Sequence, residues 1–226
     1  MPGHEAAMVS LNQSCWGILL KDQILRSLTV RAPARIHCAL LNESGVLDRI
    51  DGSVGFALCK PFWEMKVRLG SAVSNLDMVH SEHKRAIAFV LDRFRRKFAF
   101  NHEISIAVHH KIPPHIGLGS KTSLVMALGW ALSRLVPVRW DERELATFLG
   151  RGGTSGVGVH AFSEGGFIWD AGRKFPMMKQ EYGPSSEGLA PAPNKVICAD
   201  LKGFKIVHFR FALQGASGLR EIGFFK

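Results

Sequence analysis

A strand, a glycine-containing turn and a helix follow one another between residues 104 and 135. This unit constrains the fold more than any other part of the sequence. Apolar residues alternate with polar or small ones from Ile104 to His109, which is the pattern of a strand buried on one face. Apolar residues then recur at helical spacing from Leu124 to Leu135. A strand and a helix that each bury one side predict a sheet with helices packed against it, which is a layered α+β architecture and not a doubly wound one.

The rest of the chain supplies further elements of the same two kinds. Helical periodicity predicts an amphipathic helix over 81–98 with its basic residues outward. A third helix is predicted to begin at Asp141, where Asp141 and Glu144 have capping spacing, and to end at Gly150. Strand patterns occur at 28–41 with a break at Pro33, 54–58, 64–69, 165–170, 196–200 and 204–209.

These elements indicate how the chain is divided. We expect residues 27–172 to form the main domain and residues 1–26 to be an N-terminal extension or edge element. The stretch at 173–194, rich in Pro, Gly and Ser, is predicted to be a loop. Residues 195–226 are expected to be the start of a C-terminal domain.

Charge limits the partners of the chain. The formal net charge is +10, and a positive field attracts anions, so phosphorylated metabolites, nucleic acid and acidic surfaces are all candidates. The densest basic cluster falls within the predicted helix at 81–98, and we interpret it as a solvated helix face. The cluster consists of Arg93, Arg95, Arg96 and Lys97.

Cysteine spacing and apolar runs indicate the compartment. The four cysteines lie far apart and form no CxxC pair, which argues against a zinc ribbon, a thioredoxin-type site or a dense disulfide framework. The N-terminus is a poor signal peptide. The apolar run at 124–136 is interrupted by Ser133 and Arg134 and is too short to span a bilayer. We therefore expect a cytoplasmic protein without a membrane partner.

The turn at 113–123 carries the strongest chemical signal. Gly117 and Gly119 let the backbone turn tightly and approach an anion closely. The N–H groups in the first turn of the following helix would point at that anion, and the helix dipole would add positive potential. Side chains that can add hydrogen bonds or charge follow directly: Ser120, Lys121, Thr122 and Ser123. The spacing is neither that of a P-loop nor that of a Rossmann fingerprint, and a glycine turn with an ordinary helix cap is the alternative interpretation.

Several ordered motifs resemble one known family. The pattern Pro-x-x-x-Gly-Leu-Gly-Ser at 113–120 is similar to the second, phosphate-binding motif of the GHMP kinases. Lys121, Thr122 and Ser123 stand where the kinases usually continue with Ser-Ser-Ala. Further stretches resemble β-ribofuranosylaminobenzene 5′-phosphate synthase, a family within the same superfamily; they lie at 35–42, 49–58, 150–167 and 214–221.

This resemblance implies a fold and a reaction. The fold would be a two-layer GHMP-kinase-like domain with a mixed sheet packed on helices. The C-terminal domain is expected to be incomplete, because family members continue past the position of Lys226. The reaction would condense phosphoribosyl pyrophosphate with 4-aminobenzoate or 4-hydroxybenzoate, release carbon dioxide and pyrophosphate, and serve the biosynthesis of methanopterin-type one-carbon cofactors. Mg²⁺ is the implied partner of the pyrophosphate, and a homodimer is the implied assembly.

The family motifs also contain the candidate site residues. Asp51, in a tight Asp-Gly turn, is a candidate metal or sugar contact, with a purely turn-forming aspartate as the alternative. Arg35 is a candidate for holding the aromatic carboxylate, with a structural salt bridge as the alternative, and His37 is a candidate for moving protons. A second nest of backbone amides beside a guanidinium is predicted for substrate phosphate; it comprises Arg151, Gly152, Gly153, Thr154 and Ser155.

Two other functions stay open at this point. An ATP-dependent small-molecule kinase of the GHMP type would use the same loop with magnesium. A nucleic-acid-binding protein would account for the charge of +10. However, the aromatic residues fall mostly on apolar stripes and do not alternate with basic residues as a stacking platform requires, so nucleic acid is the less favoured partner.

Overall fold

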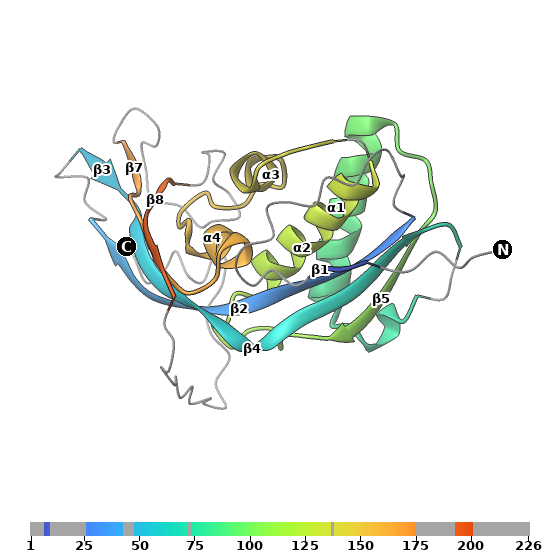
Figure 1. Cartoon of the computed structure of the whole chain (residues 1–226), viewed down its shortest axis with the longest axis horizontal. Helices are drawn as coiled ribbons and strands as arrows, with labels where there is room; N and C mark the ends of the chain where they lie inside the picture. Colours follow the sequence, from blue (N-terminus) through green and yellow to red (C-terminus); the bar gives the residue numbers. More distant parts are fainter. Residues whose placement is uncertain are drawn as a thin grey trace.

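The structure is a computed structural model that describes residues 7–9, 26–42, 48–71, 74–136, 138–174 and 193–200. In these residues a curved sheet forms one layer and four helices cover one of its faces (Figure 1). The predicted α+β fold, a mixed sheet packed on helices, is therefore confirmed. The strand predicted at 204–209, the family motif at 214–221 and most of the loop predicted at 173–194 lie outside the described residues.

Two long antiparallel strands form the centre of the sheet, β2 (Ser27–Leu41) and β4 (Gly52–Leu69). Two pairs of shorter strands were expected here. Instead, β2 passes through Pro33 with a register shift between Pro33 and Ala34, and β4 continues through Pro61. A bulge accommodates the missing N–H of a proline without ending the strand.

Shorter strands extend the sheet at its edges. A parallel strand lies along the outer edge of β2, two antiparallel strands pair with β4, and a last strand pairs with one of those. In that order they are β1 (Ala7–Val9), β5 (Ile104–His110), β6 (Phe167–Asp170) and β8 (Lys195–Ala199). The strand β8 thus belongs to the same sheet, at the position where the sequence led us to expect the start of a further domain. A separate two-stranded pair joins β3 (Arg49–Ile50) to β7 (Arg173–Lys174).

The helices lie over this sheet. They are α1 (Ser81–Phe98), α2 (Ser120–Leu135), α3 (Glu142–Phe148) and α4 (Val157–Ser163), with a short 3-10 helix η1 (Leu76–Met78) before α1. The bounds of α1 are those that the sequence predicted. The capping box before α3 is also confirmed: Asp141 accepts from the Glu144 N–H at 2.8 Å, and Glu144 accepts from the Asp141 N–H at 3.0 Å. The helix α4 was not predicted, because the glycines around it obscure any helical pattern.

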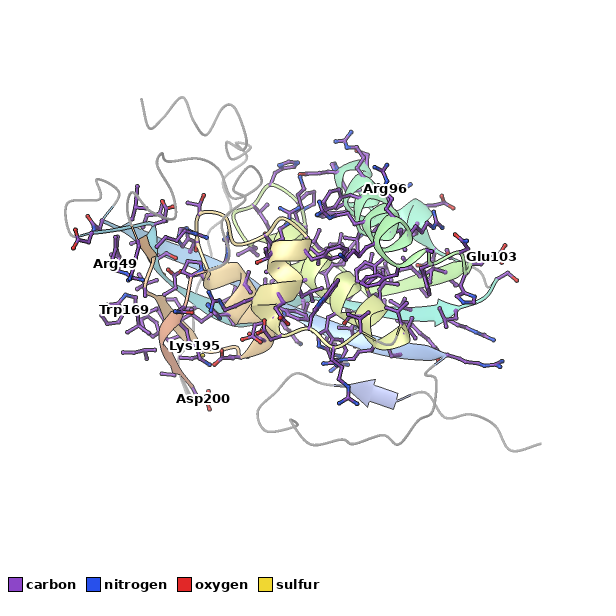
Figure 2. All side chains as sticks on the ribbon, turned by 90° about the horizontal axis from the view of Figure 1, so that it is seen from above. Arg49, Arg96, Glu103, Trp169, Lys195 and Asp200 are labelled. Atoms are coloured by element: carbon purple, nitrogen blue, oxygen red, sulfur yellow. The ribbon has the colours of Figure 1, made fainter. Side chains whose placement is uncertain are left out.

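The hydrophobic core lies between the sheet and α2. Alternate residues of β2 face the helices and are at most 2% exposed: Leu28, Val30, Ala32 and Ala34. Arg95, Arg96 and Lys97 of α1 are exposed and face away from this core, as predicted for a solvated face. Arg93, the fourth residue of the predicted cluster, is half-buried, and its guanidinium lies 5.2 Å from the centre of the Phe148 ring. Arg96 accordingly lies at the end of the molecule opposite to Trp169 and Lys195 (Figure 2). In the described part of the chain no helix combines the length and the apolar character that crossing a membrane requires.

Candidate phosphate-binding site

The loop before α2 is shaped by three residues with positive φ. These are His115 at 57°, Gly117 at 75° and Gly119 at 66°, and Gly119 is the residue that precedes the helix. The first intrahelical bond at this end runs from the Ser123 N–H to the Gly119 carbonyl, at 3.1 Å. The amides of residues 120–122 therefore come before the first helical hydrogen bond, where backbone N–H groups point out of the helix end and favour an anion.

The loop is anchored to β2. The Arg35 N–H donates to the Leu118 carbonyl at 3.1 Å, and Arg35 Nη1 donates to the Gly117 carbonyl at 3.0 Å. The Arg35 side chain also covers Gly119, where a Cβ would lie 3.0 Å from Arg35 Cγ and Nε. The sequence assigned Arg35 to an aromatic carboxylate; the structure puts its guanidinium on the phosphate loop.

Two of the predicted phosphate-binding hydroxyls serve the fold. The Ser123 hydroxyl is buried and donates to the Pro33 carbonyl at 2.8 Å, so its prediction as a phosphate ligand was wrong. The Ser120 hydroxyl lies 3.0 Å from Nε2 of the buried His83, and the Ser120 carbonyl accepts from Trp63 Nε1 at 2.9 Å. Burial lowers the pKa of His83 from 6.5 to about 4, so its ring is neutral at pH 7. Thr122 contacts α4, since a Cβ on Gly158 would lie 3.0 Å from its methyl group.

A carboxylate from α1 reaches the same loop. Glu82 Oε1 lies 3.6 Å from Lys121 Nζ, and Glu82 Oε2 lies 2.8 Å from His115 Nε2. Lys121 therefore lies beside this loop and shares its charge with Glu82. Apart from its place in the first turn of a helix, no local pattern indicates a role for Glu82, because its contacts are with residues more than thirty positions later.

Arg151 contributes a buried guanidinium on this side of the molecule. It is 8% exposed, and among the residues that the structure describes none hydrogen-bonds its Nε. Burial lowers the pKa of Arg151, and the charge of Glu82 opposes that shift, so the two side chains are within electrostatic reach. A buried guanidinium nitrogen without a partner is costly unless an anion joins it.

The rest of the second glycine-rich stretch faces a different group. The Gly152 and Thr154 carbonyls accept hydrogen bonds from Arg173, and the Ser155 hydroxyl lies 2.6 Å from that of Ser53. Gly153 is also buried. The Gly152 and Thr154 carbonyls thus point at an internal arginine, and the Ser155 hydroxyl is engaged within the fold, while phosphate binding by the amides of 152–155 stays a prediction.

Asp51 belongs to this internal polar cluster and not to the phosphate loop. Its side chain is fully buried and lies 3.6 Å from Arg173 Nη1. In the register of the sheet Gly52 is opposite Leu41, whereas Arg35 is opposite Ala57. The six residues from Arg35 to Leu41 correspond to about 20 Å of strand. Asp51 therefore does not share a site with Arg35, and we correct its prediction as a metal or sugar contact.

The buried residues Asp170 and Arg173, which the sequence did not single out, complete the internal cluster. Asp170 accepts from Ser53 and from the Gly156 N–H at 2.9 Å, and it also accepts from the Gly172 N–H at 3.0 Å. Burial raises the pKa of Asp170, and these hydrogen bonds oppose that shift. The cluster fixes the start of α4 to β6.

His37 lies two residues beyond Arg35 on β2, hence on the same side of the strand. Burial, and to a smaller extent Arg35, lowers its pKa from 6.5 to about 4. Its Nε2 is buried and has no hydrogen-bond partner among the described residues. Arg35 and His37 thus form a neighbouring pair beside the loop, as the sequence suggested, and His37 is a neutral ring at pH 7.

Comparison with known proteins shows what this chain is similar to. The GHMP kinases N terminal domain matches residues 83–166, which include the loop before α2 and the second glycine-rich stretch. Beta-ribofuranosylphenol 5′-phosphate synthase of Archaeoglobus fulgidus is 32% identical over 200 residues, covering 88% of this chain and 62% of the relative. The enzyme of the same name from Methanothermobacter thermautotrophicus is 31% identical over 209 residues, covering 88% and 63%. The chain thus spans less than two thirds of the length of these relatives.

A solved structure is similar at lower identity. Homoserine kinase from Cytophaga hutchinsonii has a TM-score of 0.49 and 21% sequence identity, over 68% of this chain and 51% of that one. A likeness at this level says nothing about the substrate.

Proposed function

We propose that this chain binds phosphoribosyl pyrophosphate on the loop before α2 and joins its ribose to an aromatic acid. The premise is that the chain belongs to the GHMP kinase superfamily and is a homologue of the β-ribofuranosylphenol 5′-phosphate synthases. The observation that carries the proposal is the buried Arg151, whose Nε has no partner in the described part of the chain. Together with Arg35 and the amides at the start of α2, it provides a positive site for a phosphate group.

The name of the relatives favours 4-hydroxybenzoate as the aromatic acid, because its condensation gives a ribosylphenol. The bond between the anomeric carbon and the pyrophosphate oxygen breaks either before the aromatic ring attacks or at the same time. The ring carbon that carries the carboxylate attacks the anomeric carbon, and the carbon–carboxylate bond then breaks. Its electron pair returns to the ring, so that carbon dioxide and pyrophosphate leave without any external oxidant or proton donor.

The protein's part in this reaction is electrostatic. Negative charge develops on the leaving pyrophosphate, and preorganised donors aimed at that charge lower the barrier. Arg35, Arg151 and Lys121 supply these donors. His37, being neutral and poorly solvated, is suited to face the aromatic ring or its carboxylate without adding a proton.

Magnesium, which the family resemblance implies, fits poorly at the residue predicted to hold it. Asp51 is fully buried and already faces Arg173 at 3.6 Å, so a cation there would be repelled by the guanidinium. Glu82, the carboxylate beside the loop, is flanked by imidazoles, which magnesium does not favour. Neither Asp51 nor Glu82 therefore suits a magnesium ion.

The binding step is tested by isothermal titration of the purified chain with phosphoribosyl pyrophosphate. Replacing Arg151 by Met should weaken binding roughly 10-fold or more, because a charge-assisted hydrogen bond contributes about 1.5–3 kcal/mol. The control Arg95→Met removes the same charge from the exposed face of α1 and should change binding less than about 2-fold. Equal binding by both variants would reject the assignment of Arg151.

The reaction is tested with 4-hydroxybenzoate labelled in its carboxyl group. Release of labelled carbon dioxide that depends on phosphoribosyl pyrophosphate supports the proposal. Protection from unfolding by ATP alone, with no response to phosphoribosyl pyrophosphate, would favour a kinase of the same superfamily instead.

A further inference from the structure

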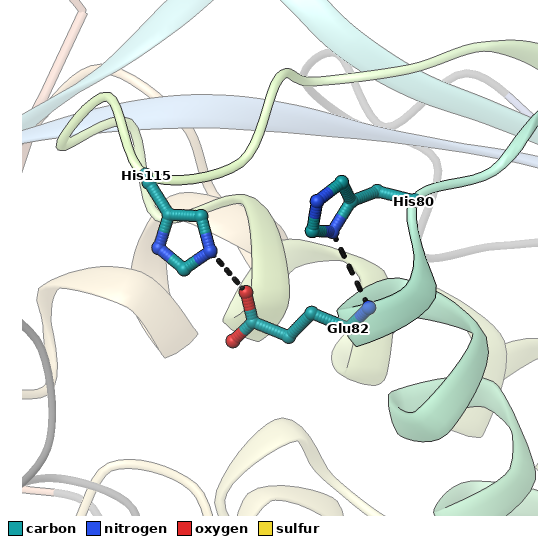
Figure 3. A group of neighbouring side chains, drawn as sticks. All are labelled: His80, Glu82 and His115. Atoms are coloured by element: carbon teal, nitrogen blue, oxygen red, sulfur yellow. Dashed lines mark hydrogen bonds and ion pairs between the residues drawn. The ribbon is translucent and has the colours of Figure 1, made fainter. Parts of the chain in front are cut away.

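Three potential metal ligands meet beside the phosphate loop (Figure 3). His80 precedes the first residue of α1, Glu82 lies in the first turn of that helix, and His115 comes from the loop before α2. One donor atom from each residue lies within 4.8 Å of the other two. Residues from two separate segments therefore present two imidazoles and a carboxylate to one point.

The geometry is close to that of a bound ion. Glu82 Oε2 and His115 Nε2 are 2.8 Å apart, and His80 Nδ1 accepts from the Glu82 N–H at 3.3 Å. Around zinc, with ligand bonds near 2.0–2.1 Å, tetrahedral donor atoms lie about 3.4 Å apart. His115 holds a positive φ of 57°, which residues other than glycine seldom adopt, and this conformation brings its ring toward α1.

The surroundings leave room for ligands from solvent. A groove of about 320 Å³ adjoins the cluster and is lined by His80 and His83 together with apolar residues such as Val79, Ile112 and Pro113. Lys121 Nζ lies 3.6 Å from the other oxygen of Glu82, so the first turn of α2 is within one side chain of the cluster. An ion with three protein ligands would thus keep at least one position for water or a phosphate oxygen.

Another cluster of similar composition lacks this opportunity. Glu142, His160 and Glu164 also bring donor atoms within 4.8 Å of one another. However, Lys195 Nζ lies 2.6 Å from Glu164 Oε1, and His160 Nε2 hydrogen-bonds the Pro193 carbonyl at 2.8 Å. Lys195 therefore holds this carboxylate more closely than Lys121 holds Glu82, at 2.6 Å against 3.6 Å, and a bound ion would have to displace it.

We propose that His80, Glu82 and His115 bind a divalent transition-metal ion, zinc or a metal with the same preferences, next to the phosphate loop. Two imidazoles and one carboxylate suit zinc, cobalt or manganese better than magnesium, which prefers oxygen ligands only. The ion adds positive charge beside Lys121, where a phosphate group would bind. This inference concerns metal binding by the chain itself and does not depend on the reaction proposed above.

Titration of the purified, chelator-treated chain with zinc chloride, in the absence of phosphate compounds, tests the proposal. One ion per chain should bind, and cobalt in its place should give the strong visible absorption of a tetrahedral or five-coordinate centre. His80→Gln and His115→Gln should each weaken zinc binding at least 10-fold. The control His109→Gln removes an exposed imidazole from β5 and should leave binding unchanged.

Two results would overturn the proposal. One is zinc binding no tighter than millimolar, and the other is binding whose affinity is the same in His80→Gln and His115→Gln as in the unchanged chain. Far-UV circular dichroism of each variant distinguishes a lost ligand from a lost fold. His80 is exposed, so His80→Gln is the variant that should keep its fold even if the loop variant does not. Zinc binding that persists in a ten-fold excess of magnesium supports selectivity for zinc over magnesium. Loss of zinc binding under these conditions would count against that selectivity.

Discussion

Alanine at Gly119 should destabilise the protein more than alanine at Gly117, and the difference should depend on Arg35. Both glycines have left-handed backbone conformations, with φ of 66° and 75°. An alanine at either position costs about 1–2 kcal/mol, because a Cβ is disfavoured there. At Gly117 no atom lies within 4 Å of the new Cβ, whereas at Gly119 it would lie 3.0 Å from two atoms of the Arg35 side chain.

The contact at Gly119 sets the size of the difference. The backbone of Arg35 is held by Leu118, so the flexible guanidinium is the part that moves away. Its hydrogen bond to the Gly117 carbonyl is then lost, and a hydrogen bond of this kind contributes about 1 kcal/mol. We therefore expect Gly119→Ala to lose about 1 kcal/mol more than Gly117→Ala, which corresponds to a further fall of about 2–4 °C in the melting temperature.

A double-mutant cycle in urea unfolding checks the reasoning. Gly119→Ala is measured in the unchanged chain and again with Arg35→Ala, which lacks both the Cγ atom and the guanidinium. The additional loss should shrink to within error in the second background. If the two glycine variants are equally stable, or if the additional loss persists without the guanidinium, the contact between Arg35 and the loop is not what the structure indicates.

Three further predictions concern the rest of the fold. Arg173→Met should cost about 3 kcal/mol in urea unfolding, because it leaves the Asp51 carboxylate buried without its cation, and adding Asp51→Leu should restore much of that loss; a cost below 1 kcal/mol would refute the pairing. Gly55→Ala should lower the free energy of unfolding by more than about 3 kcal/mol, because its Cβ would lie 2.4 Å from the Ile36 carbonyl oxygen and 2.6 Å from Val157, so that β2 or α4 must shift. A melting temperature close to that of the unchanged chain would contradict this packing. The pKa of His37 is lowered from 6.5 to about 4, so on acidification the unfolded chain binds the proton before the folded chain does. The free energy of unfolding should therefore fall by about 2 kcal/mol as the pH drops from 6.5 to 4, after allowance for partial exposure. The His37→Gln variant should show a correspondingly smaller fall over the same range.

The parts of the fold that could be predicted are those with a local periodic signal. The apolar stripe of α1 and the capping residues of α3 determine where these helices begin. The strands β2 and β4 were divided in the prediction because a proline usually ends a strand. Pro33 nevertheless lies within β2, at the register shift between Pro33 and Ala34, and its carbonyl accepts from Ser123.

The candidate site was predictable only to the extent that it is local. The loop before α2 and its glycines are contiguous in sequence and were found. Glu82 and Arg173 were missed, because each acts on residues that the chain brings near only after folding. For the same reason Asp51 was placed in the wrong cluster: a turn motif indicates the backbone conformation of a residue and not which distant side chain it will face.

The attachment of the loop to β2 has a consequence for how an anion is captured. Since main-chain bonds to Leu118 and a hydroxyl bond to Pro33 already hold the turn, its conformational entropy is lost when the protein folds and not when a ligand arrives. Association should then be fast and show little rearrangement. Its strength should follow the integrity of β2, which carries Arg35 and holds the loop, so that damage to this strand at positions away from Arg35 would also reduce affinity.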